Sequence, residues 1–167
     1  METVTHNLFA ILLQIIYFKF LIFPFNILFT VIFAFLSHII MDGFAKITYH
    51  TPDAQKGDNF WIIWHIVIYS LSILSIIIFI IPFWLVMLIA NIMDIWDWFF
   101  LRSIQKRKKK RNPDSKWGEG LFIHPISDWF RDKFLFWLPN WNYKKSGILI
   151  EILINLLFVL FILLFMN

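Results

Sequence analysis

Two short stretches of the sequence each combine a histidine and an aspartate four residues apart. His38 and Asp42 are the ends of HIIMD, and His124 and Asp128 are the ends of HPISD. On a helix, side chains at positions i and i+4 lie on the same face, about 5 to 6 Å apart at their Cβ atoms. Each pair could therefore bind one cation or form a hydrogen bond. Pro125 suits the first turn of a helix, so we expect His124 at or just before a helix start.

These residue types suggest a metal site. The chain has no cysteine, which excludes disulfides and thiolate ligands. Imidazole and carboxylate ligands suit zinc, manganese or iron. Two such sites could hold metal ions about 3.5 to 4 Å apart for in-line attack by an activated water. His65 lies in WIIWHIVIY, where its own helix offers no obvious polar partner, so we expect one from elsewhere in the protein.

Three other ionisable residues give weaker signals. Asp94 and Asp97 lie in DIWDWFFLR, which is typical of a helix end at a membrane surface. We favour a structural role for both, and Asp97 could equally pair with Arg102. His6 lies near the N-terminus and is assigned no role.

The composition predicts a membrane protein. Hydrophobic residues make up 60% of the 167 residues, whereas soluble domains contain about 45 to 50%. They fall in blocks with almost no charge, and a helix needs about 20 apolar residues to cross the hydrocarbon core. We therefore predict one all-α integral membrane domain over residues 1–167, a helical bundle of about five membrane helices plus an interfacial amphipathic segment.

Helix breakers set the expected boundaries. Gly43 is a candidate stop signal for the second helix, and Pro52 and Gly57 break the polar loop at 45–59. The next apolar block is too long for one crossing, so Pro82 is predicted to mark the turn of a helical hairpin. The predicted membrane helices cover residues 7–22, 26–42, two within 60–100, and 148–166.

Positive charge predicts the orientation. Seven of the fifteen Lys and Arg residues lie between Arg102 and Arg111, and loops rich in these residues stay cytoplasmic. The basic loop at 102–120, the loop at 45–59 and the N-terminus are then cytoplasmic. This topology puts the His and Asp segments at one depth. We therefore expect five side chains to converge: His38, Asp42, His65, His124 and Asp128.

The basic run KRKKKR could set topology, bind anionic lipid or contact nucleic acid. Each Lys or Arg beside an acidic membrane leaflet contributes about 1 kcal/mol of attraction. We expect the run to set orientation and bind anionic headgroups of membrane lipid, with no nucleic acid as partner. Residues 121–145 mix tryptophan with charge, which predicts a segment in the membrane interface, with a re-entrant segment as the alternative.

The segments SHIIMDGFAK, WIIWHIVIYS and HPISDWFRDK resemble small multi-span bacterial and phage membrane proteins with H-x-x-x-D elements. These look like distant relatives of membrane-bound metal-dependent hydrolases. The resemblance covers about residues 30–133 and implies a bacterial inner membrane. His50 resembles an extra histidine that follows the first element in some hydrolase-type members. The metal ligands implied by the resemblance are His38, Asp42, His65, His124 and Asp128.

Two functions remain open from the sequence. The first is a metal-dependent hydrolase at the cytoplasmic membrane face, in which Asp42 or His50 activates water for attack on a phospholipid or other phosphoester. The second is a non-enzymatic membrane protein, phage-encoded or part of an assembly, whose His and Asp residues are structural.

Overall fold

The computed structural model describes residues 1–51, 55 and 57–166, and within them the protein is helical, without strands. Pro52 and part of the predicted 45–59 loop lie outside these residues. The all-α prediction is confirmed. The long helices are α1 (Thr3–Phe20), α2 (Phe25–Phe44), α3 (Asn59–Ala90) and α7 (Gly147–Met166). The shorter ones are η1 (Ala45–Ile47), α4 (Ile92–Asp94), the π-helix η2 (Ile95–Leu101), α5 (Arg102–Arg111), η3 (Glu119–Leu121) and α6 (Pro125–Phe134).

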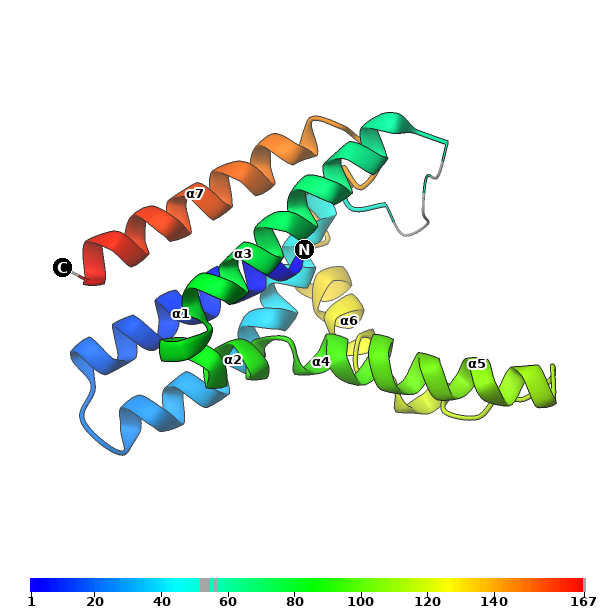
Figure 1. Cartoon of the computed structure of the whole chain (residues 1–167), viewed down its shortest axis with the longest axis horizontal. Helices are drawn as coiled ribbons and strands as arrows, with labels where there is room; N and C mark the ends of the chain where they lie inside the picture. Colours follow the sequence, from blue (N-terminus) through cyan, green and yellow to red (C-terminus); the bar gives the residue numbers. More distant parts are fainter. Residues whose placement is uncertain (52–54, 56, 167) are drawn as a thin grey trace.

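Among the described residues, four helices are long and apolar enough to cross a membrane, which is compatible with an integral membrane protein. The five membrane helices expected from the sequence thus become four candidate spans. Helix α1 lies between the other three and packs against each of them (Figure 1). Its Ala10 and Ile11 are fully buried, whereas Ile81 of α3 is 87% exposed. The exposed apolar faces of α3 and α7 suit contact with lipid.

Helix α3 bends sharply near its C-terminal end. Asn7 of α1 donates a hydrogen bond from Nδ2 to Ser75 Oγ at 2.9 Å and accepts one at Oδ1 from Asn91 Nδ2 at 2.7 Å. Sixteen residues of straight helix would separate Ser75 and Asn91 by about 24 Å. Both can reach Asn7 because the chain turns back between them, as Figure 1 shows.

The bend lies at Phe83, directly after Pro82, where φ is −126° and ψ is 17°. The proline was therefore a sound signal for a change of direction. The returning chain is not one long helix, because it is interrupted after Ala90 and continues as α4 and the π-helix η2, and the second membrane helix expected there stays a prediction.

Two further expectations need correction. Gly43 does not end α2, which continues to Phe44; a Cβ there would lie 2.8 Å from Leu135 Cδ1, so the glycine lets the segment after α6 pack closely on α2. The basic segment predicted as a loop at 102–120 is helical over its first ten residues, and this helix α5 extends away from the long helices (Figure 1).

The fold gathers several helix ends in one region. Helix α2 runs antiparallel to α1 after the short turn at residues 21–24, so the end of α2 returns to the start of α1 (Figure 1). The bend of α3 brings α4 to the same region, and α6 packs against α2 there. Segments distant in sequence can therefore place polar side chains together.

Candidate metal centre

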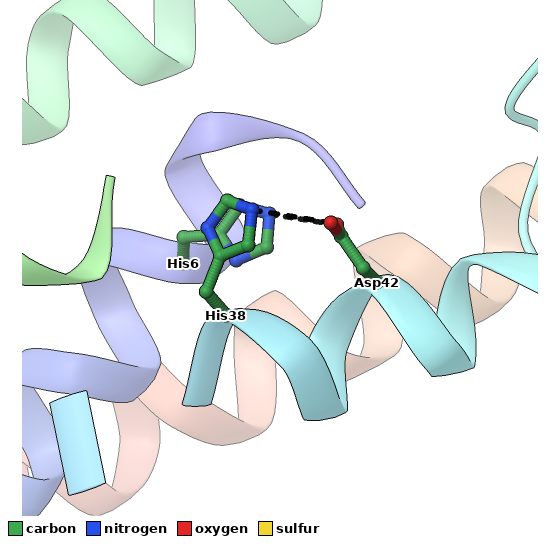
Figure 2. A group of neighbouring side chains, drawn as sticks. All are labelled: His6, His38 and Asp42. Carbon is green, nitrogen blue, oxygen red and sulfur yellow. Dashed lines mark ion pairs between the residues drawn. The ribbon is translucent and has the colours of Figure 1, made fainter. Parts of the chain in front are cut away.

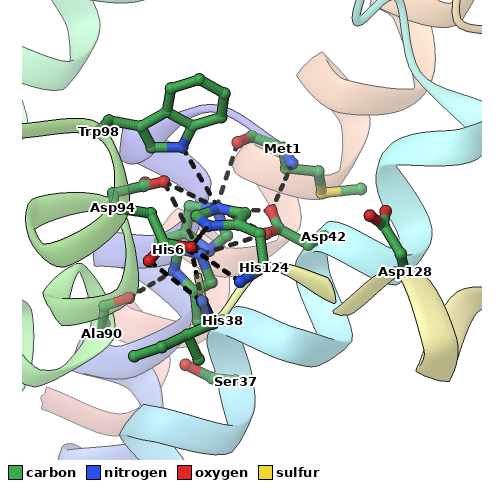
Figure 3. A network of polar contacts seen from close by, with 12 residues as sticks. Met1, His6, Ser37, His38, Asp42, Ala90, Asp94, Trp98, His124 and Asp128 are labelled. Carbon is green, nitrogen blue, oxygen red and sulfur yellow. Dashed lines mark hydrogen bonds and ion pairs between the residues drawn. The ribbon is translucent and has the colours of Figure 1, made fainter. Parts of the chain in front are cut away.

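Three histidines and two aspartates meet where these helix ends converge (Figure 3). We call them the His/Asp cluster. They come from four parts of the chain: α1, α2, α4 and the residue just before α6. The members are His6, His38, Asp42, Asp94 and His124.

Asp42 lies at the centre of the cluster. Its Oδ1 is 3.3 Å from His6 Nε2, and its Oδ2 is 3.1 Å from His38 Nε2 and 3.6 Å from His124 Nε2. The rings of His6 and His38 stack with centroids 4.1 Å apart, and both face Asp42 (Figure 2). The i, i+4 spacing on α2 thus places His38 and Asp42 together as expected.

Asp94 closes the cluster on the other side. Its Oδ1 lies 3.2 Å from His124 Nε2 and 3.9 Å from His38 Nε2. The rings of His38 and His124 meet edge to face with centroids 5.5 Å apart. Burial favours the protonated form of Asp94, but the hydrogen bond with His124 and the charge of His38 keep the pKa of this carboxyl below its usual value.

Backbone and carboxylate acceptors fix the orientation of two imidazoles. His38 Nδ1 is 2.7 Å from the carbonyl oxygen of Ala90, which can only accept, so Nδ1 carries the hydrogen. His124 Nδ1 is 2.8 Å from Asp97 Oδ2. Asp97 is buried and already accepts hydrogen bonds from the backbone N–H groups of Ile123 and His124, so it acts as an acceptor here too.

In both rings the neutral form then leaves a lone pair on Nε2. The lone pair of His38 Nε2 faces the oxygens of Asp42 and Asp94, and two hydrogen-bond acceptors repel each other unless a proton or a metal ion lies between them. His38 Nε2 is fully buried and has no aligned hydrogen bond among the described residues, although Asp42 Oδ2 is 3.1 Å away. A histidine whose second nitrogen donates to a carbonyl or carboxylate is the usual arrangement of a metal ligand.

A proton can supply the missing positive charge at His124. Burial alone would lower the pKa of His124, but hydrogen bonds with Asp94 and Asp97 raise this pKa to about 9. In the neutral form, His124 Nε2 instead accepts a long hydrogen bond of 3.4 Å from Trp98 Nε1, which a proton or a metal ion on Nε2 would displace. The Met1 amino group, 3.1 Å from Asp42 Oδ1, already supplies one positive charge to the cluster, and a protonated His124 or a metal ion would supply another.

The ligand atoms are close enough for a metal ion. They form two groups, His6–His38–Asp42 and His38–Asp94–His124, each with all ligand atoms within 4.8 Å of one another. Ligands of a tetrahedral zinc ion lie about 3.4 Å apart, as bonds of about 2.1 Å require. His38 Nε2 can bind only one ion, so the two groups are alternatives for that nitrogen.

The cluster has a closed side and an open side. The side chains of His6 and His38 are 1% and 0% exposed, whereas those of His124 and Asp94 are 23% and 33% exposed. Catalytic metal sites keep one coordination position open for water or substrate. The exposed edge at His124 and Asp94 provides access of this kind.

His65 lies outside the cluster, contrary to the expected convergence. Its Nδ1 is 2.7 Å from the carbonyl oxygen of Trp61, and its ring packs 3.9 Å from the Trp61 ring by centroids. The expected polar partner from elsewhere in the protein is not needed, because the backbone carbonyl of Trp61, one turn earlier in the same helix, fills that role.

Asp128 also lies apart from the cluster (Figure 3). Its side chain is 59% exposed and pairs with Arg131 Nη1 at 2.8 Å. His124 instead takes its carboxylate partners from Asp94 and Asp97, which belong to other elements.

His50 belongs to a second polar group. Its Nδ1 lies 3.3 Å from Glu2 Oε1, and its side chain is 44% exposed. Burial would raise the pKa of Glu2, but the hydrogen bond with His50 lowers this pKa below its usual value. Glu151 of α7 is fully buried beside them and accepts hydrogen bonds from Glu2 N and Thr5 Oγ1. His50 therefore pairs with Glu2 and lies outside the His/Asp cluster, apart from Asp42, the other residue expected to activate water.

Two members of the cluster, His6 and Asp94, were not among the ligands expected from the sequence. The alternative partner considered for Asp97, Arg102, is not the one observed: Asp97 Oδ2 lies 2.8 Å from His124 Nδ1, and the Arg102 guanidinium stacks over the Trp98 ring at 3.5 Å. The D-x-x-D spacing of the two aspartates was a usable signal. His6 gave none, because only the packing of α1 on α2 brings it to the cluster.

No family model, curated protein or solved structure matches this chain. The resemblance to membrane-bound hydrolases stays a prediction, and the function is argued from the geometry of the His/Asp cluster.

Proposed function

We propose that the protein is a membrane metalloprotein that binds a divalent zinc, manganese or iron ion in the His/Asp cluster. The observation that carries this proposal is the orientation of His38 and His124. Both rings direct Nε2 at the carboxylates of Asp42 and Asp94. Their Nδ1 atoms hydrogen-bond to the Ala90 carbonyl oxygen and to Asp97, respectively. Two imidazoles and a carboxylate form a common ligand set for these metals.

We further propose that the bound ion serves hydrolysis of a phosphoester at the membrane surface. A bound metal ion lowers the pKa of its water to about 7 and so supplies a nucleophile. Asp42 and Asp94 both lie within reach of the histidine nitrogens, so a carboxylate that does not bind the ion is placed to accept the proton of that water. The exposed edge at His124 leaves room for substrate.

We place the cluster at the cytoplasmic face. The support is the basic helix α5, which follows α4 and η2 directly and therefore lies on the same side as Asp94. Helices rich in Lys and Arg stay cytoplasmic.

A structural cluster is the second candidate, and specific contacts favour it. The amino group of Met1 is 3.1 Å from Asp42 Oδ1, and the stacked rings of His6 and His38 join α1 to α2. These contacts hold helix ends together without a metal ion.

Hydrolysis of a chromogenic phosphodiester by purified protein separates the two candidates. The protein is stripped with a chelator and supplied with zinc or manganese, and Asp94→Asn is compared with Asp128→Asn. The proposal expects metal-dependent turnover that Asp94→Asn lowers about 100-fold or more and Asp128→Asn leaves unchanged. Metal-independent turnover, or equal turnover in both variants, contradicts the hydrolase.

A further inference from the structure

A positively charged cavity lies beside the His/Asp cluster, between α5 and residues 117–122. Its volume is about 580 Å³. Three cationic side chains face one carboxylate across it, so the cavity carries an excess of positive charge. The lining residues are Arg102, Gln105, Lys106, Lys109, Glu119 and Phe122.

The three cations share one face of α5. Arg102, Lys106 and Lys109 are spaced at i, i+4 and i+7, and like charges at such spacings destabilise a helix. Among the described residues, the ion pairs of arginine and lysine involve Arg131 and Lys145 only. Within the described part of the chain, the three cations of the cavity therefore form no ion pair with a carboxylate, and Glu119 offsets only one of their three charges.

The opposite wall of the cavity is fixed by specific contacts. Gln105 Nε2 donates to the carbonyl oxygen of Trp117 at 3.2 Å, and Lys108 Nζ lies 4.6 Å from the centre of the Trp117 ring. Trp96 Nε1 donates to the carbonyl oxygen of Leu121 at 3.0 Å. These contacts hold residues 117–121 against α5 and η2, so the cavity is a built feature of the fold.

One aromatic ring connects the cavity to the cluster. The Arg102 guanidinium stacks on Trp98 at 3.5 Å, and Trp98 Nε1 lies 3.4 Å from His124 Nε2. A group held by Arg102 is therefore close to the exposed edge of the cluster.

We propose that this cavity binds the phosphate group of an anionic ligand, either a lipid headgroup or a soluble phosphoester. The guanidinium of Arg102, oriented by Trp98, suits two-point contact with phosphate oxygens, and Lys106 and Lys109 add charge. Phosphate binding is inferred from the cavity alone and does not require a metal ion in the His/Asp cluster. Its role in presenting a phosphoester to the cluster rests on the proposed function.

Binding measurements in phosphatidylcholine nanodiscs test the proposal. Two probes separate the sources: phosphatidic acid added to the bilayer, and soluble glycerol 3-phosphate. The variant Lys106→Gln/Lys109→Gln removes two charges from the cavity. The control Arg107→Gln/Arg111→Gln removes two charges from the opposite face of α5, since successive residues are rotated by about 100°.

The proposal expects the cavity variant to weaken binding about tenfold or more and the control to weaken it less than about twofold. Binding of phosphatidic acid alone identifies a lipid headgroup, and binding of glycerol 3-phosphate as well identifies a general phosphoester site. Equal weakening in both variants, or no binding of either probe, overturns the proposal. The metal content of both variants, measured in the same samples, is expected to be unchanged, so failure here is distinct from failure of the metal site.

Discussion

The orientation of the histidine rings in the cluster depends on single residues, and Asp97 is the clearest case. It is not a member of the His/Asp cluster, yet it accepts a hydrogen bond from His124 Nδ1 at 2.8 Å and from two backbone N–H groups of the same segment. Removing its charge by Asp97→Asn should lower metal affinity about 10- to 100-fold, as is typical for a residue that orients a metal ligand.

Competition with a chromophoric chelator measures this change. Asp128→Asn is the matched control, because Asp128 is exposed and pairs with Arg131 outside the cluster. Equal affinities of the two variants would show that Asp97 does not act through His124.

Sequence spacing predicted part of the residue-level result. His38 and Asp42 meet because both lie on one helix, where the i, i+4 rule is sufficient. The same rule failed for Asp128, because His124 precedes α6 and finds its carboxylates on other elements. His6 joins only through contact between helices, which no local spacing encodes.

Among the helices, the start of α7 depends on a glycine. A Cβ at Gly147 would lie 2.6 Å from Tyr49 N and 2.7 Å from Thr48 C, and backbone atoms cannot move aside easily. Gly147→Ala should therefore displace α7 and destabilise the protein by about 1 to 3 kcal/mol. Thermal unfolding in detergent measures the effect, and Gly120→Ala, with open space around the new Cβ, should unfold like the unmodified protein.

The bend of α3 depends on Asn7, which links Ser75 to Asn91. Asn7→Leu removes both hydrogen bonds and leaves the amide of Asn91 without this partner. The chain should then open at Phe83. Double electron–electron resonance between spin labels at the exposed residues Ile77 and Phe99 should show longer and more broadly distributed distances. An unchanged distance would show that packing alone maintains the bend.

For the molecule as a whole, the expected topology follows from where the helices end. The structure places the turn at 21–24 at the opposite end from the start of α3 (Figure 1). Because the chain has no cysteine, single cysteines can report sidedness. We expect Gly57→Cys and Ser103→Cys to react from one side of the membrane and Phe23→Cys from the other. Labelling of Gly57→Cys and Ser103→Cys from opposite sides would contradict the shared face.

The hydropathy of the sequence was sufficient to predict the positions of three of the four long helices. It located α1, α2 and α7 within a few residues, because uninterrupted apolar sequence is itself the requirement for a membrane helix. It could not give the number of long apolar helices, since the course of the chain after Pro82 depends on contacts with α1 that composition does not record.

Metal binding by the His/Asp cluster is the main proposal for this protein. Its most direct test is the metal-to-protein ratio after loading with zinc or manganese and dialysis, measured by elemental analysis of unmodified protein, His38→Ala and His65→Ala. We predict about one ion per chain in the unmodified protein and in His65→Ala, and its loss in His38→Ala, because His38 belongs to both ligand groups. Absence of metal from the unmodified protein, or full occupancy in His38→Ala, would show that the cluster does not bind the ion.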